Sequence, residues 1–100
     1  MDTVTINIDS KEFIAKNVGT AALYEQLAEE AAELAQAALK VSRILRGDNP
    51  TPIEPLKANE NVIKEFTDVY LVSNILDIDI DPTCFVQKKQ RWVKRIINQD

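Results

Sequence analysis

The chain has 100 residues, a net charge of −4 and a hydrophobic content of 45%. This length predicts a single domain over 1–100, with a modest core of the kind that oligomerisation often completes. The acidic balance argues against a nucleic-acid-binding surface. Histidine is absent, which excludes Ser-His-Asp and Cys-His catalysis and imidazole zinc sites. With only 2 glycines and abundant alanine, the composition favours helices.

The cysteine content bears on the cellular compartment. Cys84 is the single cysteine, so it cannot form an internal disulfide, and we expect a reducing, cytoplasmic environment. The side chain itself is expected to be a small buried apolar group. We expect no secretory signal, because no basic segment precedes an apolar one at the N-terminus. We also expect no membrane partner, since no apolar run approaches the roughly 20 residues that cross a bilayer.

The N-terminal segment begins with an alternating pattern. Apolar residues at every second position of 4–8 predict a short strand or an extended arm. Asp9 followed by Glu12 is typical of a capping box, which predicts that a short helix begins there. Gly19 would end that helix.

A long helix is predicted over 20–46, with Thr20 as its N-cap and Gly47 as its stop. Glu30 falls on the apolar seam of this helix. A carboxylate at a core position needs a cationic partner, because leaving it unpaired costs several kcal/mol. The seam follows the 4-3 rhythm of a packed helix and comprises Leu23, Leu27, Leu34, Val41 and Ile44.

A proline-rich connector, 47–59, separates this helix from the next one. Its three prolines exclude a continuous helix, and its length suggests a functional edge or a lid. The second long helix is predicted to begin near Asn59 or Asn61 and to end near Leu76. Glu65 occupies its seam as Glu30 does in the first helix, among Val62, Val69, Val72 and Leu76.

A last helix is predicted after Asp81, which with Pro82 forms a good N-cap and first-turn pair. Trp92 on this helix and Tyr70 on the previous one are expected in the core, although either could stack on a nucleobase. The fold class is therefore an all-α small helical bundle, completed by oligomerisation. The apolar residues of the last helix are Phe85, Val86, Trp92, Val93, Ile96 and Ile97.

The two long helices each carry a pair of acids three residues apart. Glu30–Glu33 and Glu65–Asp68 each lie on one helix face, so packing the helices together would bring four carboxylates into one cleft. Such a cluster requires a cation, and oxygen ligands favour Mg²⁺, with Mn²⁺ as a substitute. The alternative is that these acids are ordinary surface residues paired with lysines.

Two further groups could take part in the chemistry. Glu29 stands beside the seam and could act as a base that orients an attacking water, or it could be a solvated side chain. Lys88, Arg91 and Arg95 form a basic stripe on the last helix. The stripe could clamp phosphate oxygens, or it could complement the dipole at the helix C-terminus.

The acidic motifs resemble a known family. The segment Glu29-Glu30-Ala31-Ala32-Glu33 matches E-E-x-x-E, and Glu65-Phe66-Thr67-Asp68 matches E-x-x-D. This pair of motifs, over roughly 20–97, resembles the all-α nucleoside triphosphate pyrophosphatases of the MazG-like superfamily. The connector departs from that family's commonest layout, which affects the shape of the substrate pocket.

The resemblance implies a homodimer or homotetramer that hydrolyses nucleoside triphosphates to monophosphates and pyrophosphate, clearing non-standard or excess nucleotides. It implies phosphate contacts from Lys88, Arg91 and Arg95. Two alternatives stay open: a phosphoribosyl-ATP pyrophosphohydrolase, and a non-catalytic helical dimerisation or regulatory module. The implied magnesium ligands are Glu30, Glu33, Glu65 and Asp68.

Overall fold

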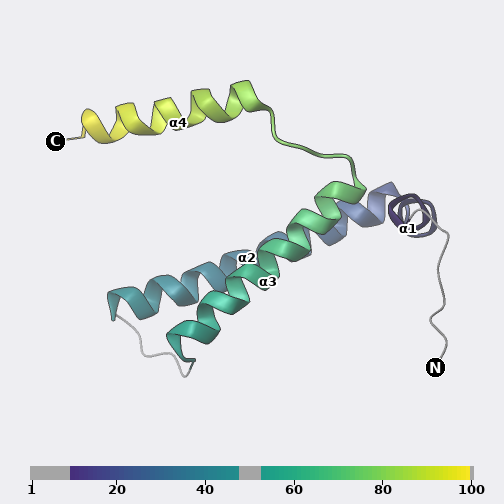
Figure 1. Ribbon diagram of the computed structural model, residues 1–100, viewed down its shortest axis with the longest axis horizontal. Coiled ribbons are helices and arrows are strands. Elements are labelled where there is room, and N and C mark those ends of the chain that lie inside the picture. Colours follow the sequence, from purple (N-terminus) through teal and green to yellow (C-terminus); the bar gives the residue numbers. More distant parts are fainter. Residues whose placement is uncertain (1–9, 48–52, 100) are drawn as a thin grey trace.

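The computed structural model describes residues 10–47 and 53–99, and no strand occurs in these ranges. The all-α fold class is therefore confirmed for the described part of the chain. The predicted strand or arm at 4–8 and the predicted cap at Asp9 lie outside it. The helices are α1 (Ser10–Val18), α2 (Thr20–Arg46), α3 (Pro55–Ile75) and α4 (Pro82–Ile97) (Figure 1).

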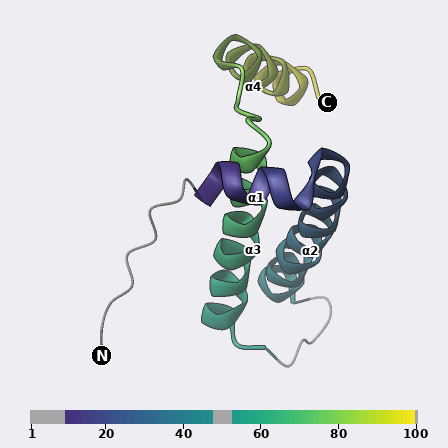
Figure 2. The same ribbon diagram turned by 90° about the vertical axis from the view of Figure 1, so that its right-hand side faces the viewer.

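The body of the molecule is an antiparallel pair of long helices, α2 and α3, which lie side by side (Figure 1). α1 lies across the end where α2 begins and α3 ends (Figure 2). Residues of both predicted seams pack together where α2 begins and α3 ends, as expected for 4-3 spacing. The core at this end is formed by the buried Leu23, Val72 and Ile75, against which Ile14, Ala15, Leu27 and Leu76 pack.

Two glycines set the ends of α2. Gly19 has a φ of 90°, a region that favours glycine, and the chain turns there from α1 into α2. The prediction that Thr20 caps α2 is therefore wrong: Gly19 occupies the N-cap position, and no side chain caps the helix. Gly47, with a φ of 68°, ends α2 in the left-handed conformation as predicted, and its N–H donates to the Arg43 carbonyl at 2.9 Å.

The start of α3 differs from the prediction. This helix begins at Pro55, and not at Asn59 or Asn61. Proline suits the first turn of a helix, where its missing N–H would have no intrahelical acceptor. Glu54 is the extended residue before it, with a φ of −65° and a ψ of 145°. The earlier start brings Ala58, which is 2% exposed, into the contact with α2.

α4 stands apart from the rest of the chain. Its predicted cap is confirmed, since Asp81 Oδ1 accepts from the backbone N–H groups of Thr83 and Cys84 at 3.0 and 3.1 Å. Yet α4 contacts none of the other described helices (Figure 1). The radius of gyration is 18.5 Å, compared with about 13 Å for a compact chain of this length.

Three burial predictions are wrong. Trp92 is 64% exposed because nothing packs against its helix, and Tyr70 is 66% exposed because it lies on the side of α3 away from the buried core. Cys84 is half-buried, and not fully buried. None of the helices that the structure describes is both long enough and apolar enough to cross a bilayer.

Candidate metal centre

The acidic residues on the seams are held between α2 and α3. Glu30 lies between the half-buried Leu27 and Leu34, one turn away from each along α2. Glu65 lies between Val62 and Val69, which are half-buried in the same way on α3. Both carboxylates are thus carried at positions where the helix spacing would otherwise place apolar side chains.

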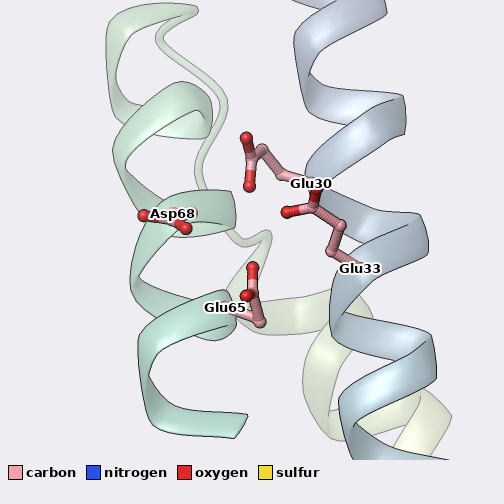
Figure 3. Close-up of side chains that lie close together, drawn as sticks. All are labelled: Glu30, Glu33, Glu65 and Asp68. Atoms are coloured by element: carbon pink, nitrogen blue, oxygen red, sulfur yellow. The ribbon is translucent and has the colours of Figure 1, made fainter. Parts of the chain in front are cut away.

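The two acidic pairs meet across the helix contact. Figure 3 shows Glu30 and Glu33 on α2 reaching toward the side of α3 that carries Glu65 and Asp68. One carboxylate oxygen from each residue lies within 4.8 Å of the corresponding oxygens of the other three. Glu33 is exposed, whereas the other three side chains are half-buried. The predicted convergence of four carboxylates is therefore confirmed.

Two of these oxygens are buried without a hydrogen-bond donor. Oε2 of Glu30 and Oε2 of Glu65 are shielded from solvent, and no protein donor reaches either of them. The other oxygen of Glu30, Oε1, accepts from Gln26 Nε2 at 2.7 Å. Gln26 therefore holds the Glu30 side chain from one turn earlier on α2, while Oε2 remains available for a ligand.

Within the described part of the chain, no basic side chain forms an ion pair with the cluster. The ion pairs among residues 10–47 and 53–99 join Lys11 with Asp77 and Lys57 with Glu60, and neither includes a member of the cluster. The surface alternative, in which the acids pair with lysines, is therefore not what the structure shows. At about 5 Å, two negative charges repel by about 3 kcal/mol at an effective dielectric constant of 20.

The donor set fits a hard divalent cation. All the ligand atoms are carboxylate oxygens, and a cation among them would offset the mutual repulsion and give the two buried oxygens a partner. Mg²⁺ and Mn²⁺ prefer such oxygen ligands and commonly keep several waters, which leaves room for a substrate. Glu30, Glu33, Glu65 and Asp68 could thus hold a metal ion.

A polar pocket of about 310 Å³ adjoins the cluster. Glu33 and Glu65 form part of its wall, together with Gln36, Lys40 and Asn61. None of these last three residues was predicted from the sequence as part of a site. Helical spacing could have found them, because Lys40 follows Glu33 by seven residues and Asn61 precedes Glu65 by four, so each lies on the face that carries the acids.

The other predicted site residues lie away from the cluster. Glu29 is exposed on α2 and is not one of the clustered acids. Lys88, Arg91 and Arg95 are exposed on α4, which does not contact α2 or α3. The catalytic role of Glu29 and the phosphate contacts of the basic stripe remain predictions.

Comparison with models of known protein families, with curated proteins and with solved structures found no match. The assignment of a function therefore depends on the acidic cluster, the adjoining pocket and the motifs of the sequence.

Proposed function

We propose that this chain is a Mg²⁺-dependent nucleoside triphosphate pyrophosphohydrolase that converts (d)NTPs to (d)NMPs and pyrophosphate. The observation that carries the proposal is the convergence of four carboxylates with two buried oxygens that lack a donor. The resemblance of the two motifs to MazG-like pyrophosphatases adds the substrate class. In this role the protein would remove non-standard or excess nucleotides from the cytoplasm, as a homodimer or homotetramer.

The metal, when bound by the cluster, would supply electrostatic stabilisation of the phosphate oxygens. In the reaction, a water oxygen forms a bond to a phosphorus and the anhydride bond between the α and β phosphates breaks. The water loses a proton, and the pyrophosphate leaves. Glu29, which adjoins Glu30 in the sequence and is exposed outside the cluster, is proposed to accept that proton.

In the proposed reaction, the substrate contacts from within one chain come from the pocket next to the cluster. Lys40 is a half-buried residue whose ammonium group can bind a phosphate oxygen that the cluster does not reach. The amides of Gln36 and Asn61 can donate to, or accept from, a sugar or base. The volume of about 310 Å³ lies at the lower end of the range for ligand pockets, about 300–1,000 Å³.

The decisive assay measures pyrophosphate release from a panel of canonical and modified nucleotides, with phosphoribosyl-ATP included and with Mg²⁺ and Mn²⁺ compared. We expect turnover that requires the metal and falls at least 100-fold in Glu65→Gln. Glu25→Gln is the matched control, since Glu25 is exposed on α2 outside the cluster, and it should retain activity.

Two results would count against the proposal. The first is an absence of pyrophosphate release from every nucleotide in the panel. The second is turnover that is unchanged in Glu65→Gln. If phosphoribosyl-ATP alone is hydrolysed, the reaction class stands and the proposed substrate is replaced.

A further inference from the structure

α4 presents an apolar side that nothing in the described chain covers. Phe85, Trp92 and Ile96 recur along one row of the helix, and they are 53%, 64% and 60% exposed. Val86, Val93 and Ile97 form the adjacent row. An isolated helix of 16 residues is marginally stable in water, so α4 needs a partner for this surface.

α3 carries a second uncovered apolar stripe. Leu56, Ile63 and Tyr70 repeat every seven residues on its outer side, where they are 71%, 67% and 66% exposed. Beside Tyr70, Phe66 and Ile80 help to line a hollow of about 450 Å³, which is large enough for an aromatic side chain. A seven-residue repeat is the spacing with which one helix packs along another.

α4 and the rest of the chain also have opposite net charge. α4 carries 5 basic side chains and no acidic one, whereas residues 1–81 carry 7 basic and 15 acidic side chains, a net charge of −8. The hollow on α3 has Asp77 and Asp79 in its wall, together with Lys11, which pairs with Asp77. α4 is basic and has one apolar side, whereas the rest of the chain is acidic and has an apolar stripe on α3. The two are therefore complementary in hydrophobicity and in net charge.

We propose that α4 of one copy of this chain packs on the outer stripe of α3 in a second copy, and that the exchange is reciprocal. Both uncovered surfaces are then buried in one step, in an interface with two-fold symmetry. This inference does not depend on the metal site or on the proposed activity. The proposed contact buries the apolar residues of α4, which are not part of the core of the single chain.

The connection to α4 favours a second copy over the α3 of the same chain. Asp77 has a φ of 59°, and the following residues, 78–81, are not helical, so the chain leaves α3 without folding α4 back onto it (Figure 1). Asp77 is paired with Lys11 of α1, which ties the start of this connection to the body. An extended connection that carries one element away is typical of exchanged dimers.

An anionic lipid surface is the competing occupant, because basic amphipathic helices with aromatic residues bind such surfaces. Two features of the molecule favour a second copy. A lipid surface would leave the stripe of Leu56, Ile63 and Tyr70 uncovered. It would also repel residues 1–81, whose net charge is −8.

The first test is sedimentation equilibrium of the full chain across a range of concentrations. We expect a reversible dimer that Trp92→Glu weakens roughly 30-fold or more, as for a buried aromatic residue at an interface. Gln87→Glu is the matched control, because it adds the same charge to the polar side of α4, about 160° around the helix from Phe85. The control should dimerise like the wild type. Dimerisation should also weaken as salt is raised.

The second test maps the contact between chains in a Cys84→Ser background. One tagged chain carries Ile96→Cys on α4 and an untagged chain carries Tyr70→Cys on α3. A bismaleimide added to the mixture should yield a crosslinked heterodimer, whereas a partner with Gln87→Cys in place of Ile96→Cys should not. Circular dichroism of each variant establishes that α1–α3 remain folded.

Three outcomes would overturn the proposal. One is a monomer at every concentration that sediments with phosphatidylserine vesicles, which would assign α4 to a lipid surface. Another concerns a single chain that carries both Ile96→Cys and Tyr70→Cys. If this chain crosslinks internally and no crosslink forms between chains, α4 is folded back on its own α3. The third is a dimer that Trp92→Glu and Gln87→Glu affect equally.

Discussion

At the scale of single residues, the informative feature is the pair of glutamates on apolar seams. Glu30 and Glu65 could be singled out from the sequence because helix spacing gave each a neighbour of Leu or Val on either side along the seam. Their convergence followed from packing the two seams together. The buried Oε2 atoms and the hydrogen bond from Gln26 to Glu30 required coordinates, because side-chain rotamers do not follow from spacing.

Glu29 and Glu30 have different proposed roles: Glu29 accepts a proton, whereas Glu30 binds the metal. Glu29→Gln is expected to lower kcat by about 100-fold or more while leaving metal affinity unchanged, because only the proton acceptor is lost. Activity assays paired with Mn²⁺ titrations measure the two effects in the same samples. A variant with full kcat would remove Glu29 from the mechanism and leave it as the solvated side chain that its exposure allows.

Lys40 should contribute to substrate binding through its place in the pocket beside the cluster. Lys40→Met is expected to raise KM for a triphosphate by about tenfold, the effect of losing one charge-assisted hydrogen bond. Lys64→Met serves as the control, since Lys64 is exposed on α3 and does not line the pocket. Equal KM values in the two variants would contradict this role.

At the scale of helices, the sequence predicted the number and order of the described elements well. Gly19, Gly47 and Asp81 set helix ends through local backbone chemistry, which sequence patterns report directly. Pro55 was assigned to the connector because proline breaks a helix, although it can equally begin one. The placement of Trp92 in the core failed for another reason, since an apolar face shows that a helix needs a partner but not which chain supplies it.

The cap of α4 gives a prediction at this scale. Asp81→Ala removes the acceptor for two backbone N–H groups and should destabilise α4 by about 1 kcal/mol. Amide hydrogen exchange should become faster in 82–97. In protein dilute enough to be monomeric, the amides of α2 and α3 should keep their protection, because α4 does not contact these helices within the chain. Asp79→Ala, which leaves the cap intact, is the control.

At the scale of the molecule, a thin body formed by α1–α3 encloses a cluster of like charges. The fully buried apolar residues are few in the described chain, so the repulsion among the carboxylates is a substantial fraction of the folding free energy. Metal binding and association between copies would both add stability that the single chain lacks.

This balance predicts that metal binding and the removal of one repelling charge each raise Tm. At a Mg²⁺ concentration 100 times its Kd, binding should add about 2.7 kcal/mol and raise Tm by about 10 °C or more. Without metal, Glu65→Gln should be more stable than the wild type by about 1 kcal/mol, because one repelling charge is gone. Differential scanning calorimetry at fixed protein concentration measures both shifts. A metal-free Glu65→Gln variant with a lower Tm would contradict the repulsion argument.

The central claim is that the carboxylates of α2 and α3 gather a divalent cation between the helices. Calorimetric titration of Mg²⁺ and Mn²⁺ into the wild type and into Glu30→Gln tests it most directly, with Glu25→Gln as the control of equal charge. We expect saturable binding to the wild type and the control, and at least a tenfold loss of affinity in Glu30→Gln. Equal affinities in all three proteins, or no saturable binding to the wild type, would contradict the claim.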